Sequence, residues 1–540
     1  MLLTVVILLP VVVAGLLFVV PGLSGRNATW VWVVTSALDL ALIAWMWWRF
    51  DPGQDVSGVV NGLAFAVKVP WIPSVDASYY VGVDGLSLPL LALTGVLFLV
   101  CALWSLGEPQ RPRSQAALFL FLQTACLGTF ASLDLILFFV FFDLTIVGMY
   151  FIIAGWGHGN ARRSALKFFL YTFLGSLALL VGFIGIFLGG EPRTFDMVRL
   201  AANPPFENSP TAAGLVLLAV GLGLAVKTPL FPFHTWLPDA HTDAPAQGSA
   251  ILAGVLLKLG TYGFVRIAMP ILPGAWQRWA MVVVIIGVIS VLWGAFVALA
   301  QTDVKRMVAY TSVNHMGYVL LGLGAAGFVG TADAEARTVA TVGAIYQMVS
   351  HGLLTGAMFL LTGVLWSRGR TYDFARWGGL ARPAPVFAAL LAVAAFGSLG
   401  LPGLSGFIAE FQVFAGALRA VPIATVLAVV GILVSAGLFL VMLQRLLTGP
   451  TLVPGGSGGA ARDSEPPIGR RWAGPSDGAE SAGATATLEA DLVGMPDVRG
   501  REVAAILPLL ILAVVLGLFP RDLLDVIEPA AAAVVQLVSR

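Results

Sequence analysis

Charged residues are scarce in this chain of 540 residues. Only 11% of them are Asp, Glu, Lys or Arg, whereas 58% are hydrophobic, and the mean hydropathy is +0.91. This balance lies far outside the range of soluble domains. The net charge of +1 leaves neither a basic face for nucleic acid nor an acidic, solubilising tail. The composition therefore predicts a membrane protein that does not bind nucleic acid.

Cysteine is nearly absent as well. The two cysteines, Cys101 and Cys126, lie in apolar runs without a second cysteine at CxxC spacing. This spacing argues against iron–sulfur clusters, structural zinc and a disulfide framework. The chain also lacks GxGxxG and GxxxxGK[ST] motifs that follow a strand. We therefore expect no cofactor and no metal on this chain, and any dehydrogenase activity belongs to partner subunits.

Long apolar runs dominate what is present. A membrane span needs roughly 17 to 25 apolar residues, and the runs are continuous rather than alternating, which favours helices over a β-barrel. The sequence predicts an all-α polytopic membrane protein with about 14 transmembrane helices. The expected spans are 2–20, 29–48, 84–106, 114–131, 133–155, 167–188, 211–230, 246–270, 276–300, 304–326, 338–366, 384–418, 423–447 and 503–519.

The ends and loops of the chain set its orientation. The apolar N-terminus has no basic segment and no clear cleavage site, so we interpret it as a retained helix. The loops that follow odd-numbered spans carry more Lys and Arg than the others, including Arg111, Arg113, Arg162 and Arg163. The positive-inside rule then predicts that both termini face the outside of a bacterial inner membrane.

One loop differs from the others in composition. Residues 449–502 are rich in Gly, Ala, Ser and Pro and contain few large apolar side chains, above all between 451 and 486. Such a segment buries too little surface to offset its ordering entropy, so we predict a disordered cytoplasmic insertion. Residues 503–540 are expected to form the last span and a tail with a short amphipathic helix.

Four ionisable side chains lie near the middle of predicted spans: Asp143, Lys258, His315 and His351. An ionisable group at that depth costs at least ~2.5 kcal/mol on insertion scales, so it is neutral, paired or solvated by buried water. One such group has no clear meaning, but four in separate spans indicate a route for protons or other ions.

Two further ionisable residues lie beside predicted helix breaks. Lys227 precedes Pro229 and Pro232, which remove backbone donors and must break the seventh span. The stretch GLPGLSGFIAEF contains Pro402 and Gly403 and predicts a second break just before Glu410. Paired broken helices in two halves of a chain point to an inverted-repeat transporter with its site near the midplane.

Six motifs then resemble one known family. The segments VGVDGLSLPL (81–90), KTPLFPFHTWLPDAH (227–241), LLKLGTYGFVR (256–266), DVKRMVAYTSVNHMGYVL (303–320), YQMVSHGLLTGAMFLLTG (346–363) and GLPGLSGFIAEF (400–411) are similar to those of the antiporter-like subunits of respiratory complex I. The resemblance runs in order over almost the whole chain. The acidic Glu410 in the twelfth span resembles the chain M type, because chains L and N typically carry lysine there.

The resemblance implies a division of the chain. It implies two inverted five-helix repeats, with broken helices in spans 7 and 12, around a water-filled axis that lies across the membrane. The expected segments are a three-helix N-terminal part, two repeats, the insertion, and the last span with its tail: 1–106, 114–270, 276–447, 449–502 and 503–540.

The resemblance also implies roles for single residues. Lys227 and Lys258 match the lysines of the seventh and eighth spans, His315 and His351 the bridging histidines, and Glu410 the terminal carboxylate. Asp143 takes the place of a glutamate on the fifth span. Because aspartate is one methylene shorter, about 1.5 Å of bond length, either direct pairing with Lys227 or a bridging water is open. A close pair is worth roughly 4 kcal/mol at about 4 Å and an effective dielectric near 20.

Three residues in the loop of the broken seventh span have two possible interpretations. His234, Asp239 and His241 either tie the broken-helix loop together or take up protons.

The sequence leaves more than one function open for the chain. The first is proton translocation in NADH:quinone oxidoreductase. Its partners are then other membrane-arm subunits, including neighbouring antiporter-like chains, and the lipid bilayer. FMN, iron–sulfur clusters, NADH and quinone then belong to partner subunits. The alternatives are a subunit of a multisubunit Na⁺/H⁺ antiporter or membrane-bound hydrogenase, and a haem protein with His315 and His351 as axial ligands.

Overall fold

The fold is a bundle of long helices. The computed structural model describes residues 1–20, 24–51, 63–107, 110–454 and 495–540. Its first half contains α1 (Leu2–Val19), α2 (Gly25–Arg49), β1 (Ala64–Ile72), η1 (Pro73–Val75), β2 (Ala77–Val83), α3 (Leu88–Ser105), α4 (Pro112–Ala131), α5 (Leu135–Trp156), α6 (Ala161–Gly189), α7 (Met197–Ala202), α8 (Pro210–Lys227), α9 (Leu237–Asp243), α10 (Ala246–Ile251), η2 (Leu252–Leu256), α11 (Leu257–Gly263), η3 (Phe264–Ala268) and α12 (Met269–Ile271).

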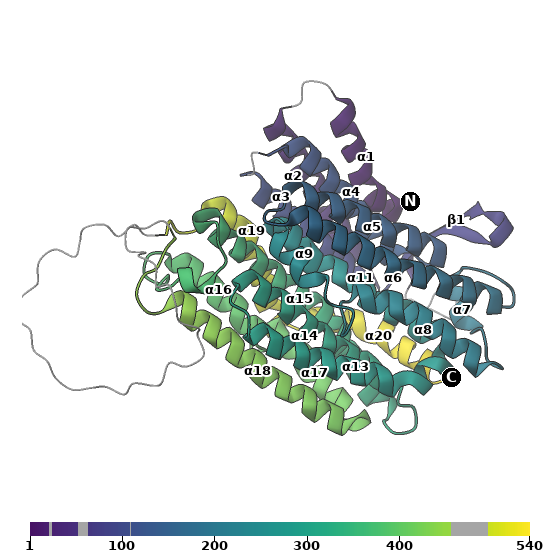
Figure 1. Ribbon diagram of the computed structural model, residues 1–540. Helices are drawn as coiled ribbons and strands as arrows, with labels where there is room; N and C mark the ends of the chain where they lie inside the picture. Colours follow the sequence, from purple (N-terminus) through teal and green to yellow (C-terminus); the bar gives the residue numbers. More distant parts are fainter. Residues whose placement is uncertain (21–23, 52–62, 108–109, 455–494) are drawn as a thin grey trace, which may run out of the picture.

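The second half is again helical. It contains α13 (Pro273–Leu299), α14 (Val304–Ala325), α15 (Ala334–Gly369), η4 (Phe374–Arg376), α16 (Pro385–Ser398), α17 (Ser405–Ala420), α18 (Pro422–Leu447), α19 (Gly500–Leu518) and α20 (Arg521–Val538). In Figure 1 these helices lie below and beside those of the first half in one elongated bundle.

The predicted all-helical membrane fold is confirmed. Twelve helices of the described residues are long and apolar enough to cross a membrane. The two remaining expected spans are also helical: α14, which carries several polar side chains, and the pair α16 and α17, which are the two parts of one interrupted span. The charges and the break lower the apolar length of these segments without changing their helical structure.

A two-stranded hairpin was not predicted. Strands β1 and β2 pair antiparallel between α2 and α3, and the hairpin projects from one end of the bundle (Figure 1). Its sequence, AFAVKVPWI followed by ASYYVGV, is rich in β-branched and aromatic residues, which favour strands. Lys68 of β1 binds Asp196, the N-cap of α7, at 2.5 Å. A search for spans alone could not detect this element.

The eighth span lies entirely inside the protein. It runs from Ala246 to Ile271 as three α-helical pieces joined by two π-helical turns, η2 and η3, and its whole length is buried, whereas α15 is buried in its central part and partly exposed at both ends. A π turn holds one extra residue and is frequent at functional sites. These two helices therefore form the centre of the bundle, with the other helices around them.

The seventh span is broken where the prolines predict it. Helix α8 ends at Lys227, and α9 begins only at Leu237. The carbonyl of Val226, left free by the break, accepts a hydrogen bond from Trp236 Nε1 at 3.0 Å. The backbone N–H of Phe231 donates to Ser290 Oγ of α13 at 3.0 Å. The break is thus stabilised because side chains replace the lost helical hydrogen bonds.

The twelfth span is broken as well. Helix α16 ends at Ser398 and α17 begins at Ser405, with Pro402 and Gly403 in the turn between them. Gly400 and Gly403 have φ values of +79° and +95°, which only glycine adopts readily. A Cβ on Gly400 would lie 2.4 Å from Glu410 Oε2, so the turn packs directly against the carboxyl group.

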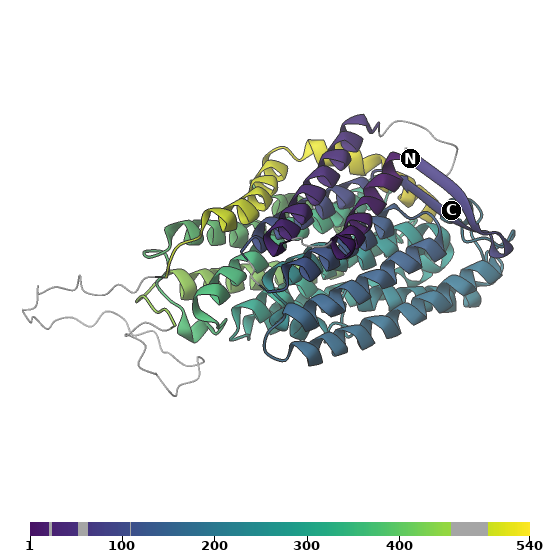
Figure 2. The same ribbon diagram turned by 90° about the horizontal axis from the view of Figure 1, so that it is seen from above.

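Most of the predicted insertion, residues 455–494, lies outside the described residues. The chain after it is held in place: Arg368 Nη1 and Nη2 bind the Glu502 carboxylate at 2.5 and 2.7 Å, and both side chains are buried. Helices α19 and α20 then run along one side of the bundle (Figure 2). The tail is helical, as expected, and one face of α20 is buried.

The two breaks take the same place in two series of five spans. In the first series α6 packs against α8, and in the second α15 packs against α17. The boundaries of two inverted repeats at 114–270 and 276–447 stay a prediction. Both termini lie at the same end of the bundle in Figures 1 and 2, as an even number of spans requires.

We expect that end of the bundle to face the outside. Reporter fusions at Met1 and Arg540 should be active as alkaline phosphatase and not fluorescent as cytoplasmic fluorescent protein, because the basic loops hold the other end in the cytoplasm. A fusion after Leu447, at the end of α18, is the matched control and should behave in the opposite way. Fluorescence at both termini would reverse the orientation.

Candidate functional site

Lys227 is buried at the C-terminal end of α8, just before the break. Its Nζ donates a hydrogen bond to Thr145 Oγ1 of α5 at 2.8 Å and lies 4.8 Å from the centre of the Phe142 ring. Only 2% of the residue is exposed. A lysine at a helix C-terminus also interacts favourably with the free carbonyls there. The ammonium group is thus held by a hydroxyl, an aromatic face and a helix end.

Asp143 lies on α5, two residues before Thr145. In the part of the chain that the structure describes, no ion pair joins Asp143 to Lys227, and the buried Asp143 Oδ1 has no hydrogen-bond partner. Of the two arrangements left open by the sequence, direct pairing is therefore not the one observed.

Lys258 lies at the centre of the bundle and is completely buried. Its Nζ binds the carbonyl of Ala253, within the π turn η2, and contacts His351 Nδ1 of α15 at 2.6 Å. Among the described residues no carboxylate forms an ion pair with this amine, so its charge has only neutral acceptors.

The two histidines and Glu410 continue from Lys258. The rings of His351 and His315 are in contact, with centroids 5.2 Å apart. His315 Nε2 lies 3.1 Å from the carbonyl oxygen of Ser398, at the end of α16, and 4.0 Å from Glu410 Oε1. The break in span 12 therefore supplies a free carbonyl to one histidine and brings the carboxyl group next to it.

The loop residues of the seventh span fall into two groups. Asp239 is partly exposed and binds Lys167 at 2.6 Å and Arg306 at 3.6 Å, which ties α9 to α6 and α14. His241 and His234 are buried: His241 stacks on Phe359, and His234 Nε2 accepts from Trp293 Nε1 at 3.1 Å.

These contacts bear on the two readings of the loop. The ion pairs of Asp239 and the hydrogen bond of His234 connect the loop to neighbouring helices, and the choice between loop support and proton uptake for these residues stays a prediction. Both ring nitrogens of His241 lack a hydrogen-bond partner among the described residues, so a second role for this histidine stays a prediction.

Sequence reasoning missed a cluster beside His241. Lys305 of α14 is fully buried, and its Nζ donates to the carbonyl of Ala244 at 2.5 Å and lies over the Tyr372 ring. His158, in the loop after α5, stacks on Trp366. Burial, with Lys305 and Arg370 nearby, lowers the pKa of His158 to about 3, so this histidine is neutral. Lys305 follows the loop too closely to be detected as a mid-span charge.

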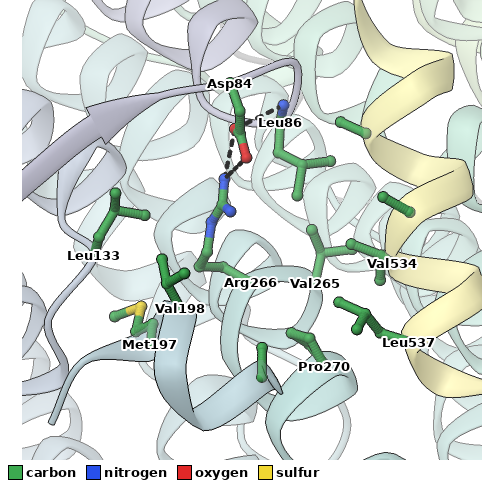
Figure 3. A pocket seen from close by; sticks show the side chains of 13 residues that line it. Asp84, Leu86, Leu133, Met197, Val198, Val265, Arg266, Pro270, Val534 and Leu537 are labelled. Carbon is green, nitrogen blue, oxygen red and sulfur yellow. Dashed lines mark hydrogen bonds and ion pairs between the residues drawn. The ribbon is translucent and has the colours of Figure 1, made fainter. Parts of the chain in front are cut away.

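A second missed feature is a buried ion pair at the far end of the eighth span. Arg266 Nη2 binds both carboxylate oxygens of Asp84, at 2.5 and 2.6 Å (Figure 3), and Arg266 Nε donates to Tyr262 Oη. The pair forms one wall of a cavity of about 30 Å³ that α7 and α20 close. Arg266 was present in the motif LLKLGTYGFVR, but it lies near a span end, where a charge alone indicates little.

The predicted site residues thus form two groups. Lys258, His351, His315 and Glu410 are one continuous cluster. Lys227 and Asp143 lie near Thr145, and within the described ranges no direct contact joins Lys227 to Lys258. No group of three His, Cys, Asp or Glu among those same residues is placed to hold a metal ion.

Comparison with known proteins gives one family. Residues 132–435 match the family described as NADH:quinone oxidoreductase/Mrp antiporter, TM. The chain is 40% identical over 387 residues to NADH-quinone oxidoreductase subunit M of Rickettsia conorii, covering 71% of this chain and 76% of that protein. It is 34% identical over 502 residues to subunit M of Rickettsia bellii, covering 93% and 90%.

A solved structure agrees with these matches. The fold superimposes on a chain of respiratory complex I from Thermus thermophilus with a TM-score of 0.81 and 29% identity, with 100% of both chains covered. The sequence match over most of the chain therefore agrees with the structure, which has the same fold with broken spans and buried lysines. The chain belongs to the family of antiporter-like membrane subunits of NADH:quinone oxidoreductase, within its subunit M group.

Proposed function

We propose that this chain, as a membrane-arm subunit of NADH:quinone oxidoreductase, translocates protons through its buried Asp, Lys, His and Glu residues and intervening water. The observation that carries the proposal is the continuous cluster from Lys258 through His351 and His315 to Glu410, all of it buried in the centre of the bundle. Charged groups at that depth are costly and are retained where they conduct ions.

The chemistry of Lys258 suits a relay. Its amine contacts a neutral imidazole and a carbonyl rather than a carboxylate, so a proton that reaches it is not trapped in an ion pair. His351 accepts or donates at either ring nitrogen, which lets a proton enter at one side of the ring and leave at the other. Glu410 at the end of the cluster can hold the proton before release.

Among the described residues Asp143 and Lys227 form no direct ion pair, so the two charges can approach and separate during translocation. Two opposite unit charges about 4 Å apart attract by roughly 4 kcal/mol at an effective dielectric near 20, relative to full separation. Moving one charge against about 150 to 200 mV costs about 3.5 to 4.6 kcal/mol. Opening and closing this pair is therefore of the right size to drive one translocation step, powered by redox chemistry in partner subunits that carry FMN, iron–sulfur clusters and the NADH and quinone sites.

The alternatives have less support. The matched family includes Mrp antiporters, but the relatives with 34% and 40% identity are subunits M of NADH-quinone oxidoreductase. A haem between His315 and His351 would need their rings on opposite faces of a porphyrin, whereas the rings touch each other. We place the chain in a bacterial inner membrane beside other membrane-arm subunits, including neighbouring antiporter-like chains.

Replacing Lys227 tests the proposed route. In the assembled complex in vesicles, Lys227→Ala should lower proton translocation per NADH oxidised, by about tenfold or more through this subunit, because ~1.4 kcal/mol of added barrier already gives tenfold. Fluorescence quenching of a pH dye measures it. Lys68→Ala removes a lysine of the hairpin outside the spans and should leave translocation normal. A normal proton-to-electron ratio in Lys227→Ala would refute the assignment of Lys227.

Asp143 gives a second test. Asp143→Glu adds one methylene, about 1.5 Å of bond length, and restores the longer carboxyl side chain typical of this position, so translocation should be kept. Asp143→Asn keeps the size and removes the charge, so the coupling of translocation to NADH oxidation should fall severalfold. Both variants are compared at equal amounts of assembled complex on native gels. Equal activity of the Asn variant and the unmodified protein would show that the charge is not needed.

A further inference from the structure

A glutamine that the proposed route does not use lies next to its last step. Gln347 is one helical turn before His351 on α15 and is 2% exposed. Together with His315, His351 and Glu410 it lines a small cavity between α14, α15, α16 and α17. Its Oε1 accepts no hydrogen bond from the described residues. A buried amide oxygen without a partner is costly, typically about 1–3 kcal/mol, and calls for an explanation.

A second atom at this cavity has the same property. Within the described ranges His351 Nε2 also has no hydrogen-bond partner, whereas His351 Nδ1 on the other side of the ring contacts Lys258 at 2.6 Å. The cavity measures about 10 Å³, which is at the lower limit for one water molecule. A buried water needs two to four polar partners, and Gln347 Oε1, His351 Nε2 and the Glu410 carboxyl group provide them.

His315 is engaged elsewhere. Its Nε2 lies 3.1 Å from the carbonyl oxygen of Ser398, which can only accept, so Nε2 carries the hydrogen and donates it there. Glu410 Oε1 is farther away, at 4.0 Å. A proton that passes through His315 must first break the bond to Ser398. The free nitrogen of His351 offers a path without that cost.

We propose that Gln347 positions one water molecule that carries protons directly from His351 to Glu410, past His315. Lys258 gives a proton to His351 Nδ1, His351 gives its Nε2 proton to the water, and the water gives another of its protons to a Glu410 oxygen. One proton moves and the water is unchanged. His351 is left with its hydrogen on Nδ1, and a proton shift from Nδ1 to Nε2 must restore the starting tautomer before the next transfer. Gln347 is a positioning residue, because it touches the water and not the proton acceptor.

The proposal rests on the proposed function, and three variants of the assembled complex test it. Gln347→Leu has nearly the same size but cannot bind water, and its proton translocation per NADH oxidised should fall to the level of Glu410→Gln. Gln347→Asn keeps the amide and leaves room for more water, and should translocate nearly as the unmodified protein does. The matched control is Gln412→Leu on α17, since Gln412 Oε1 is also buried without a described partner but does not line the cavity.

The order of the two Gln347 variants decides between hydration and packing. A packing role predicts that the smaller Asn is worse than Leu, whereas the water site predicts the reverse. Normal translocation in Gln347→Leu, or a loss in Gln347→Asn at least as large, overturns the proposal. Loss in Gln412→Leu equal to that in Gln347→Leu overturns it too. If Glu410→Gln and Lys227→Ala translocate normally, the proposed function itself has failed.

Discussion

The backbone hydrogen bond is the constraint on which this structure depends. Inside a membrane a broken helix leaves donors and acceptors that water cannot reach, so each break must be repaired by other groups. In the seventh span Trp236 and Ser290 make that repair, and in the twelfth the free carbonyl of Ser398 meets His315. The repair of the second break is also what places a titratable ring beside Glu410. The atoms that complete the backbone hydrogen bonds therefore also belong to the proposed proton route.

Burial by protein rather than lipid allows the charges to remain. The eighth span and the central part of α15 are enclosed by protein, and Lys258 on the eighth span contacts His351 on α15. A polar group in this position faces other side chains and small cavities, which supply partners that hydrocarbon lacks. The outer helices, which are less than half buried in several cases, shield this centre from the bilayer.

Prediction from the sequence was successful where the residue type alone indicates a structural feature. Pro232 and Gly403 mark the breaks, and mid-span Lys258 marks the buried cluster, because each is unfavourable anywhere else. It failed where the role of a residue depends on contacts with residues far away in the sequence. Gln347 and Lys305 are ordinary residues until the fold places them beside Glu410 and His241, and no apolar pattern predicts the hairpin. The relation of Asp143 to Lys227 was also beyond the sequence, since one methylene and the positions of two backbones decide it.

The two π turns around Lys258 have a consequence for how this span changes during evolution. A π turn contains one residue more than an α turn, so each one rotates everything after it by about 100° relative to an unbroken α-helix. The direction of the Lys258 side chain is thus set by the number of residues before it as much as by its own identity. Loss of one residue from 252–255 would keep every motif intact and yet turn the amine away from His351.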